Sequence, residues 1–73
     1  MARIAVIGEP TRVGGFALAG AVVCPAETAE QSQQAWQALP VDVAVVVMTA
    51  SAADAIGADR HRPGAPLTVV APP

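Results

Sequence analysis

Two long apolar runs stand out in the pattern of hydrophobic and polar positions along this chain. The first, Ile4 to Ile7, ends at Gly8, and the second extends from Val41 to Met48. Apolar runs without polar alternation are typical of strands that are buried on both faces of a parallel sheet. Two shorter apolar runs predict two further strands, Ala21 to Cys24 and Leu67 to Val70.

The segment after the first strand predicts a crossover helix. Thr11 is a suitable N-terminal cap for a helix over residues Arg12 to Ala19, which Gly20 would end. Gly14 and Gly15 each lower helix propensity by about 1 kcal/mol relative to alanine. We expect that this loss of helix propensity is compensated by close approach of the helix to the sheet or to the backbone of another chain.

A second helix is expected to begin at Pro25, or slightly later with Thr28 and Gln31 at capping-box spacing, and to end at Pro40. Its apolar and small residues follow helical spacing, so they should share the face that covers the sheet. These residues are Ala29, Ser32, Trp36 and Leu39.

A third, short helix is expected after the second long strand. Thr49 and Ser51 follow that strand, and Asp54 stands three positions after Ser51, so Ser51 is the expected cap of a helix that ends near Ala58. The segment Arg60 to Pro66 is rich in turn-forming residues and predicts a loop.

The alternation of strands and helices predicts one domain over residues 1–73, an α/β protein with a small three-layer fold of the Rossmann-like (receiver-like) kind. The two long apolar strands need cover on both faces and should be central. The predicted sheet therefore has four parallel strands in the order 2-1-3-4, with right-handed crossovers.

In this arrangement, the strand order reverses between strands one and three, which is where open α/β sheets bind ligands. A candidate crevice for an anion or a small ligand therefore lies between the two strand ends. Its residues are Gly8, Glu9, Thr11, Thr49 and Ser51. The glycines match neither the dinucleotide fingerprint nor the phosphate loop with its lysine, because the spacing differs and the chain has no lysine.

Composition narrows the classes of partner. Four arginines and six carboxylates give a net charge of −2, and no arginine cluster exceeds the pair Arg60 and Arg62, so nucleic-acid binding is not expected. The longest apolar run is far shorter than the ~20 residues that span a bilayer, and no signal peptide is expected. Charged residues make up 14% of the chain, which leaves part of the surface apolar. Either an interface or a general preference for alanine and valine explains this composition.

No set of residues with catalytic chemistry emerges from the sequence. Receiver chemistry needs an acidic cluster, an aspartate on the third strand and a lysine, whereas Thr49 stands at the end of that strand. Cys24 is expected to be a small buried apolar residue, and His61 a solvated loop residue without a second metal ligand. Trp36 is expected in the core, and Asp42 at a solvated edge. We therefore expect no catalytic residue, no metal and no cofactor.

Several segments resemble the rotary ATPases of the archaeal and vacuolar (A/V) type, specifically their F subunit. The stretch Gly15-Phe16-Ala17-Leu18-Ala19-Gly20 is the most distinctive part of the likeness. The other matching segments are Ile4 to Glu9, Thr11, Val13, Trp36 to Leu39, Asp42 to Thr49 and Pro66 to Val70.

The resemblance implies a non-catalytic component of the central stalk, or rotor. In that family, the F subunit is a small Rossmann-like domain that docks on the coiled coil of the D subunit. It takes part in coupling ATP hydrolysis or synthesis to proton or sodium transport. The implied partners are the D subunit and other rotary ATPase subunits, and the implied location is cytoplasmic, peripheral to the membrane without insertion into it.

This sequence departs from the family pattern at three places. Glu9 stands where an aspartate is common, and Ala17 where an arginine is common. The family's usual C-terminal helix is not expected within these residues. Two groups of residues are candidates for the partner interface, the loop after the first strand and the glycine-rich start of the first helix. They are Glu9, Pro10, Thr11, Gly14, Gly15 and Phe16.

Overall fold

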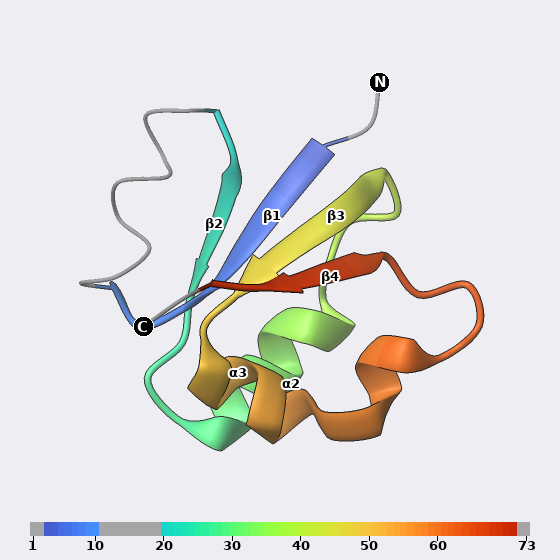
Figure 1. Ribbon diagram of the computed structural model, residues 1–73. Helices are drawn as coiled ribbons and strands as arrows, with labels where there is room; N and C mark the ends of the chain where they lie inside the picture. Colours follow the sequence, from blue (N-terminus) through green and yellow to red (C-terminus); the bar gives the residue numbers. More distant parts are fainter. Residues whose placement is uncertain (1–2, 11–19, 72–73) are drawn as a thin grey trace.

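The sheet has four parallel strands in the order β2-β1-β3-β4, as the sequence predicts. The computed structural model describes residues 3–10 and 20–71 (Figure 1). The strands are β1 (Arg3–Gly8), β2 (Val22–Pro25), β3 (Val43–Met48) and β4 (Leu67–Val70).

Strand β1 lies between β2 and β3 and is the most deeply buried strand. Ala5 and Ile7 point to one face and Val6 to the other, and all three are at most 1% exposed. Strand β3 is also central, but Ala44 is exposed and Val45 and Val47 are only half-buried. The prediction of burial on both faces is therefore confirmed for β1 from Ala5 to Gly8, whereas Ile4 remains exposed, and only partly confirmed for β3.

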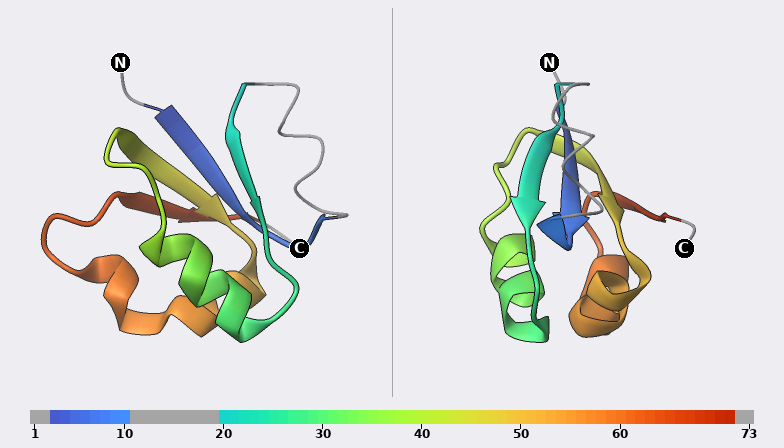
Figure 2. Two further views of the ribbon diagram at one scale, coloured as in Figure 1. Left: turned by 180° about the vertical axis from the view of Figure 1, so that it is seen from behind. Right: turned by 90° about the vertical axis from the view of Figure 1, so that its left-hand side faces the viewer.

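Both described helices, α2 (Ala29–Gln37) and α3 (Ala50–Ile56), lie on the same face of the sheet (Figures 1 and 2). The 3-10 helix η2 (Gly57–His61) continues from α3 on that side. Apolar side chains of the two helices and of the sheet face beneath them form one core. Its buried members are Ala5, Ile7, Ala26, Trp36, Val43, Val46, Met48, Ala52, Ala53 and Ile56.

The second helix begins later than its first proline suggests. Pro25 is the last residue of β2 and pairs with Gly8 of β1, so it ends a strand instead of opening a helix. Helix α2 starts at Ala29, because the Thr28 hydroxyl accepts a hydrogen bond from the Gln31 amide at 3.1 Å. Capping at Thr28 was the later of the two expected starts, and it is confirmed.

Helix α2 also ends before Pro40, since its last residue is Gln37. Of the four residues expected on its inner face, Ser32 and Trp36 are buried and Leu39 is half-buried, whereas Ala29 is exposed. Ala29 is the first residue of the helix, within the exposed stretch from Glu27 to Gln31. The expectation for Ala29 was wrong.

Two further boundaries differ from the prediction. Strand β3 begins at Val43, because Val41 and Asp42 form the turn that leads into it. Helix α3 is capped by Thr49, whose hydroxyl accepts a hydrogen bond from the Ala52 amide at 3.3 Å, so the expected cap at Ser51 was wrong. The first part of the predicted loop is helical, since η2 extends to His61.

The register of the sheet aligns apolar residues on its second face. Ile4 pairs with Val45, and Val45 pairs with Leu67, while Val47 pairs with Val69. These five side chains share the face that points away from α2 and α3, and we call this set the outer face. Ile4, Leu67 and Val69 are 50%, 68% and 47% exposed.

The predicted first helix, Arg12 to Ala19, lies outside the described residues, and with it the third layer of the expected fold. Gly20, which was expected to end that helix, has a φ of 81°. Such a left-handed conformation is typical of the residue that follows a helix. Within residues 3–10 and 20–71, no helix has the length and hydrophobicity that crossing a bilayer requires.

Candidate functional site

The carboxyl ends of β1 and β3 lie side by side, as the predicted crevice requires. The Thr49 amide donates to the Ile7 carbonyl at 3.1 Å, which holds the residue after β3 against the end of β1. The Ser51 hydroxyl then donates to the Glu9 carboxylate at 3.3 Å. Gly8, Glu9, Thr49 and Ser51 therefore come together in the structure, and Thr11 lies outside the described residues.

The polar side chains of this crevice make their hydrogen bonds with one another and with the start of α3. Thr49 already caps α3, and its hydroxyl oxygen lies 3.4 Å from that of Ser51. The Ser51 hydroxyl in turn has the Glu9 carboxylate as its acceptor. An anion would therefore meet a negative charge instead of a set of free donors, which argues against the anion-binding interpretation of this crevice.

The residues expected at a partner interface are only partly described. Glu9 is half-buried and Pro10 exposed at the end of β1. Thr11, Gly14, Gly15 and Phe16 lie outside the described residues, so their part in an interface stays a prediction.

The structure also places Cys24 and His61, two further residues that the sequence analysis considered. Cys24 is half-buried and packs against the core, and burial raises the pKa of its thiol, which favours the unreactive protonated form. His61 is exposed at the end of η2. Among the described residues, no three His, Cys, Asp or Glu side chains are grouped as a metal site would require.

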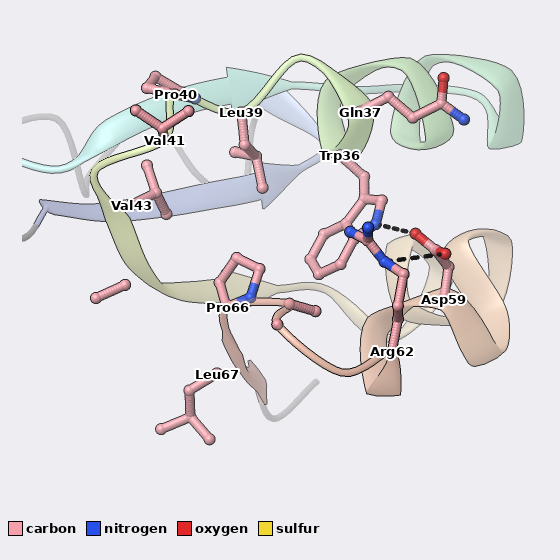
Figure 3. A pocket seen from close by; sticks show the side chains of 13 residues that line it. Trp36, Gln37, Leu39, Pro40, Val41, Val43, Asp59, Arg62, Pro66 and Leu67 are labelled. Atoms are coloured by element: carbon pink, nitrogen blue, oxygen red, sulfur yellow. Dashed lines mark hydrogen bonds and ion pairs between the residues drawn. The ribbon is translucent and has the colours of Figure 1, made fainter.

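A pocket of about 780 Å³ lies at the opposite end of the sheet, where β3 and β4 begin. It is bounded by the end of α2, the turn into β3, η2 and the loop before β4 (Figure 3). We call it the amino-end pocket. Its lining residues are Trp36, Gln37, Leu39, Pro40, Val41, Val43, Ala44, Asp59, Arg62, Gly64, Ala65, Pro66 and Leu67.

Charged groups gather at one end of the amino-end pocket. The Trp36 indole Nε1 donates to the Asp59 carboxylate at 2.5 Å, and Arg62 Nε lies 3.5 Å from the other oxygen of that carboxylate (Figure 3). Trp36 is 6% exposed, which confirms its predicted place in the core. Its polar edge nevertheless reaches the pocket, a role that the helical spacing alone does not reveal.

The amino-end pocket was missed at the sequence level because its residues come from two stretches that are far apart in sequence, 36–44 and 59–67. Trp36 and Asp59 are 23 positions apart, and no short motif joins them. One signal was present: the Pro40-Val41-Asp42 turn carries an apolar residue where turns are usually polar. Val41 is fully exposed.

An ion pair fixes the amino ends of the two central strands. Arg3 Nε and Nη2 donate to the two oxygens of Asp42 at 2.6 and 2.8 Å. These hydrogen bonds lower the pKa of the Asp42 carboxyl, and the charge of Arg3 acts in the same direction. Both side chains are exposed, which agrees with the solvated edge expected for Asp42.

Comparison with known protein families finds a match over most of the chain. The model of a family described as ATP synthase (F/14-kDa) subunit matches residues 4–70, which include both described helices and all of the four strands except Arg3. A search of curated proteins finds no match.

Proposed function

The chain belongs to the family of ATP synthase (F/14-kDa) subunits, the F subunit of V/A-type ATPases, and from this premise we propose that it is a non-catalytic component of the central stalk. In this role it docks on the coiled coil of the D subunit. It thereby takes part in coupling ATP hydrolysis or synthesis to the movement of protons or sodium ions. The family match over residues 4–70 is the observation that carries the proposal.

The geometry at the carboxyl ends of the strands supports a role without bond chemistry. Enzymes of this architecture place reactive groups where β1 and β3 end. Here the side chains at that place are engaged with one another: Thr49 caps a helix, and Ser51 donates to Glu9. This arrangement stabilises the start of α3, and the Ser51 hydroxyl serves to link the residues that follow β1 and β3.

Exposed apolar side chains support a docking role. Ile4, Leu67 and Val69 on the outer face, and Val41 beside the amino-end pocket, are all between 47% and 105% exposed. Apolar surface of this kind gains free energy when a partner covers it. The proposed location follows from the role, since a stalk component lies in the cytoplasm and reaches the membrane only through the complex.

Co-purification tests the proposal. The chain and its cognate D subunit are expressed together, with an affinity tag on the latter only, and the complex is isolated by size exclusion. We expect the two proteins to elute together at a defined ratio. An unrelated coiled coil of similar length and charge serves as the control. Absence of the chain from the fractions that contain the D subunit, while both proteins are folded by circular dichroism, would contradict the proposal.

Thermal unfolding separates this role from ligand binding at the crevice. A ligand at about 100 times its dissociation constant stabilises a protein by ~2.7 kcal/mol. We expect inorganic phosphate, ATP and ADP to leave the unfolding temperature unchanged, because Glu9 opposes an anion beside Ser51. A shift that disappears in the Ser51→Ala variant would instead favour the ligand-binding function.

A further inference from the structure

The segment between α3 and β4 is anchored at its two ends and exposed between them. Ile56, the last residue of α3, is 8% exposed, and Ala65 packs against the core. Residues 58–63 contain no buried side chain, and Arg60 is the one that is half-buried. Figure 1 shows this segment on the outside of the molecule, between the end of α3 and the start of β4. We call residues 58–63 the strap.

Within the described residues, one hydrogen bond joins the strap to a part of the chain that is distant in sequence. The Trp36 indole Nε1 donates to the Asp59 carboxylate at 2.5 Å (Figure 3). The contacts of Arg62 are local: its Nε lies 3.5 Å from the Asp59 carboxylate, and its amide donates to the Asp59 carbonyl at 3.1 Å. The strap therefore has internal order and is linked to α2 at one point.

Glycines with left-handed backbone conformations stand on both sides of the strap. Gly57 has φ 66° and Gly64 has φ 85°, and at neither residue does an atom lie within 4 Å of the position that a Cβ would take. Hinges are a few residues in loops or at the ends of elements that absorb a change in φ and ψ. The two glycines are suited to this role, because they are uncrowded and carry no side chain.

The present position of the strap has a cost at Arg60. The Nε of this residue is shielded from solvent and has no acceptor among the described residues. Such a group gives up its hydrogen bond to water without replacement, which is unfavourable. A strap that moves away from the sheet returns the group to water. The loss of the Asp59 contact on opening is therefore offset in part at Arg60.

We propose that the strap opens as a unit about Gly57 and Gly64 while the core stays folded, and that opening uncovers the indole of Trp36 and widens the amino-end pocket. Trp36 is only 6% exposed when the strap is closed, and Asp59 lines the pocket beside it. Local opening of this kind occurs in segments with few buried apolar contacts. The inference concerns the chain by itself and does not depend on the proposed function.

Hydrogen exchange at the Trp36 indole measures the opening. The chain has one tryptophan, so the NMR signal of its Nε1 proton is assigned without ambiguity. Relative to its intrinsic rate, this proton should exchange at least about tenfold faster than the backbone amides in the middle of β1 and β3, which exchange only when the sheet unfolds. Low concentrations of urea should accelerate exchange of those amides and leave the indole unchanged, because opening of the strap exposes little surface.

Gly64→Ala tests the hinge. Alanine disfavours the left-handed conformation of the closed strap, so indole exchange should become at least about fivefold faster. Gly20→Ala is the matched control, because Gly20 has φ 81° and equal space at its Cβ position but lies outside the strap. This variant should change the rate of indole exchange by less than about twofold, since it acts on global stability alone.

Arg60→Met should act in the opposite direction. It removes the shielded Nε and keeps an unbranched side chain, so the closed strap is favoured and indole exchange should become about fivefold slower. His61→Met, at the exposed neighbouring position of the strap, is the control and should leave the rate within about twofold of that of the unaltered chain.

Three results would overturn the inference. The first is indole exchange with the rate and urea dependence of the core amides, which would mean that Trp36 is released only by global unfolding. The second is an equal effect of Gly64→Ala and Gly20→Ala. The third is an indole that responds to neither Gly64→Ala nor Arg60→Met. None of these measurements involves the D subunit, so the proposed function stands or falls separately.

Discussion

Trp36 combines two roles in one side chain. Its ring belongs to the core beneath the sheet, while its Nε1 donates to Asp59 at 2.5 Å in the amino-end pocket. The spacing of α2 predicted the first role, because burial follows from which helix face the ring occupies. The second role depends on where η2 lies relative to α2, which is a property of the folded chain.

A double-mutant cycle measures the Trp36–Asp59 hydrogen bond. Trp36→Phe removes the donor and Asp59→Ala the acceptor, and the two changes should be coupled by about 1 kcal/mol in the free energy of unfolding, the usual contribution of such a bond. Urea unfolding of the two single variants and the double variant gives this energy. Strict additivity of the two effects would contradict the contact.

The Arg3–Asp42 pair predicts a pH dependence of stability. Hydrogen bonds from Arg3 lower the pKa of Asp42 in the folded state, so the pair stabilises the fold above the unfolded-state pKa of about 3.9 and loses this effect as the pH falls through the folded-state value. Asp42→Asn should therefore be less stable than the unaltered chain near neutral pH.

The difference in stability between Asp42→Asn and the unaltered chain should disappear in strong acid, because the carboxyl of Asp42 is then protonated in both the folded and unfolded states. Urea midpoints measured at neutral pH and at about pH 2 check this expectation. A constant difference at every pH would mean that the introduced asparagine acts through packing or backbone geometry. The effect should also weaken in high salt, because both side chains are exposed.

At the scale of elements, the sequence placed the four strands and the two described helices and missed several of their ends. The start of α2 at Ala29 depends on the pairing of Pro25 with Gly8, which extends β2 by one residue. The start of α3 depends on Thr49, which is held against Ile7 by a backbone hydrogen bond. The local cap at Thr28 was one of two starts that the sequence offered for α2, and strand pairing decides between them, whereas the cap of α3 at Thr49 was not predicted.

The junction between α3 and η2 requires glycine. Gly57 has φ 66° and ψ −142°, and its amide donates to the Ala53 carbonyl, which ends the α-helix. No atom lies within 4 Å of the position that a Cβ would take, so space is available and only the backbone conformation opposes a side chain. Gly57→Ala should therefore cost about 1–3 kcal/mol in the free energy of unfolding.

D-Alanine at position 57, introduced by chemical synthesis, is the control for this prediction. The mirror image of the Gly57 conformation is an extended one that alanine adopts without strain, so the D-residue should keep the stability of the unaltered chain. Urea unfolding of the three proteins checks the order. Equal losses from L- and D-alanine would indicate an effect of the methyl group itself.

At the scale of the whole molecule, the exposed outer face governs behaviour in solution. Strand β4 is an edge strand whose Leu67 and Val69 are 68% and 47% exposed, and the chain carries a net charge of only −2. Edge strands with apolar side chains and few charges favour self-association. We therefore expect the isolated chain to self-associate at concentrations at which a protein with a covered edge strand stays monomeric.

Val69→Lys should raise the concentration at which light scattering increases, while the free energy of unfolding stays within about 0.5 kcal/mol. The substitution changes the net charge from −2 to −1, so a general effect of charge predicts lower solubility, not higher. Gln34→Lys makes the same change in charge on α2. If it raises solubility equally, the outer face is not responsible.

The sequence by itself determined the parallel sheet, its strand order and the central place of β1 and β3, because unbroken apolar runs need cover on both faces and short links restrict the topology. It also determined the family, through residues spread along most of the chain. Only the tertiary structure decided which polar groups meet. Ser51 donates to Glu9, and Trp36 donates to Asp59 beside Arg62, since such contacts depend on the packing of segments that are far apart in sequence.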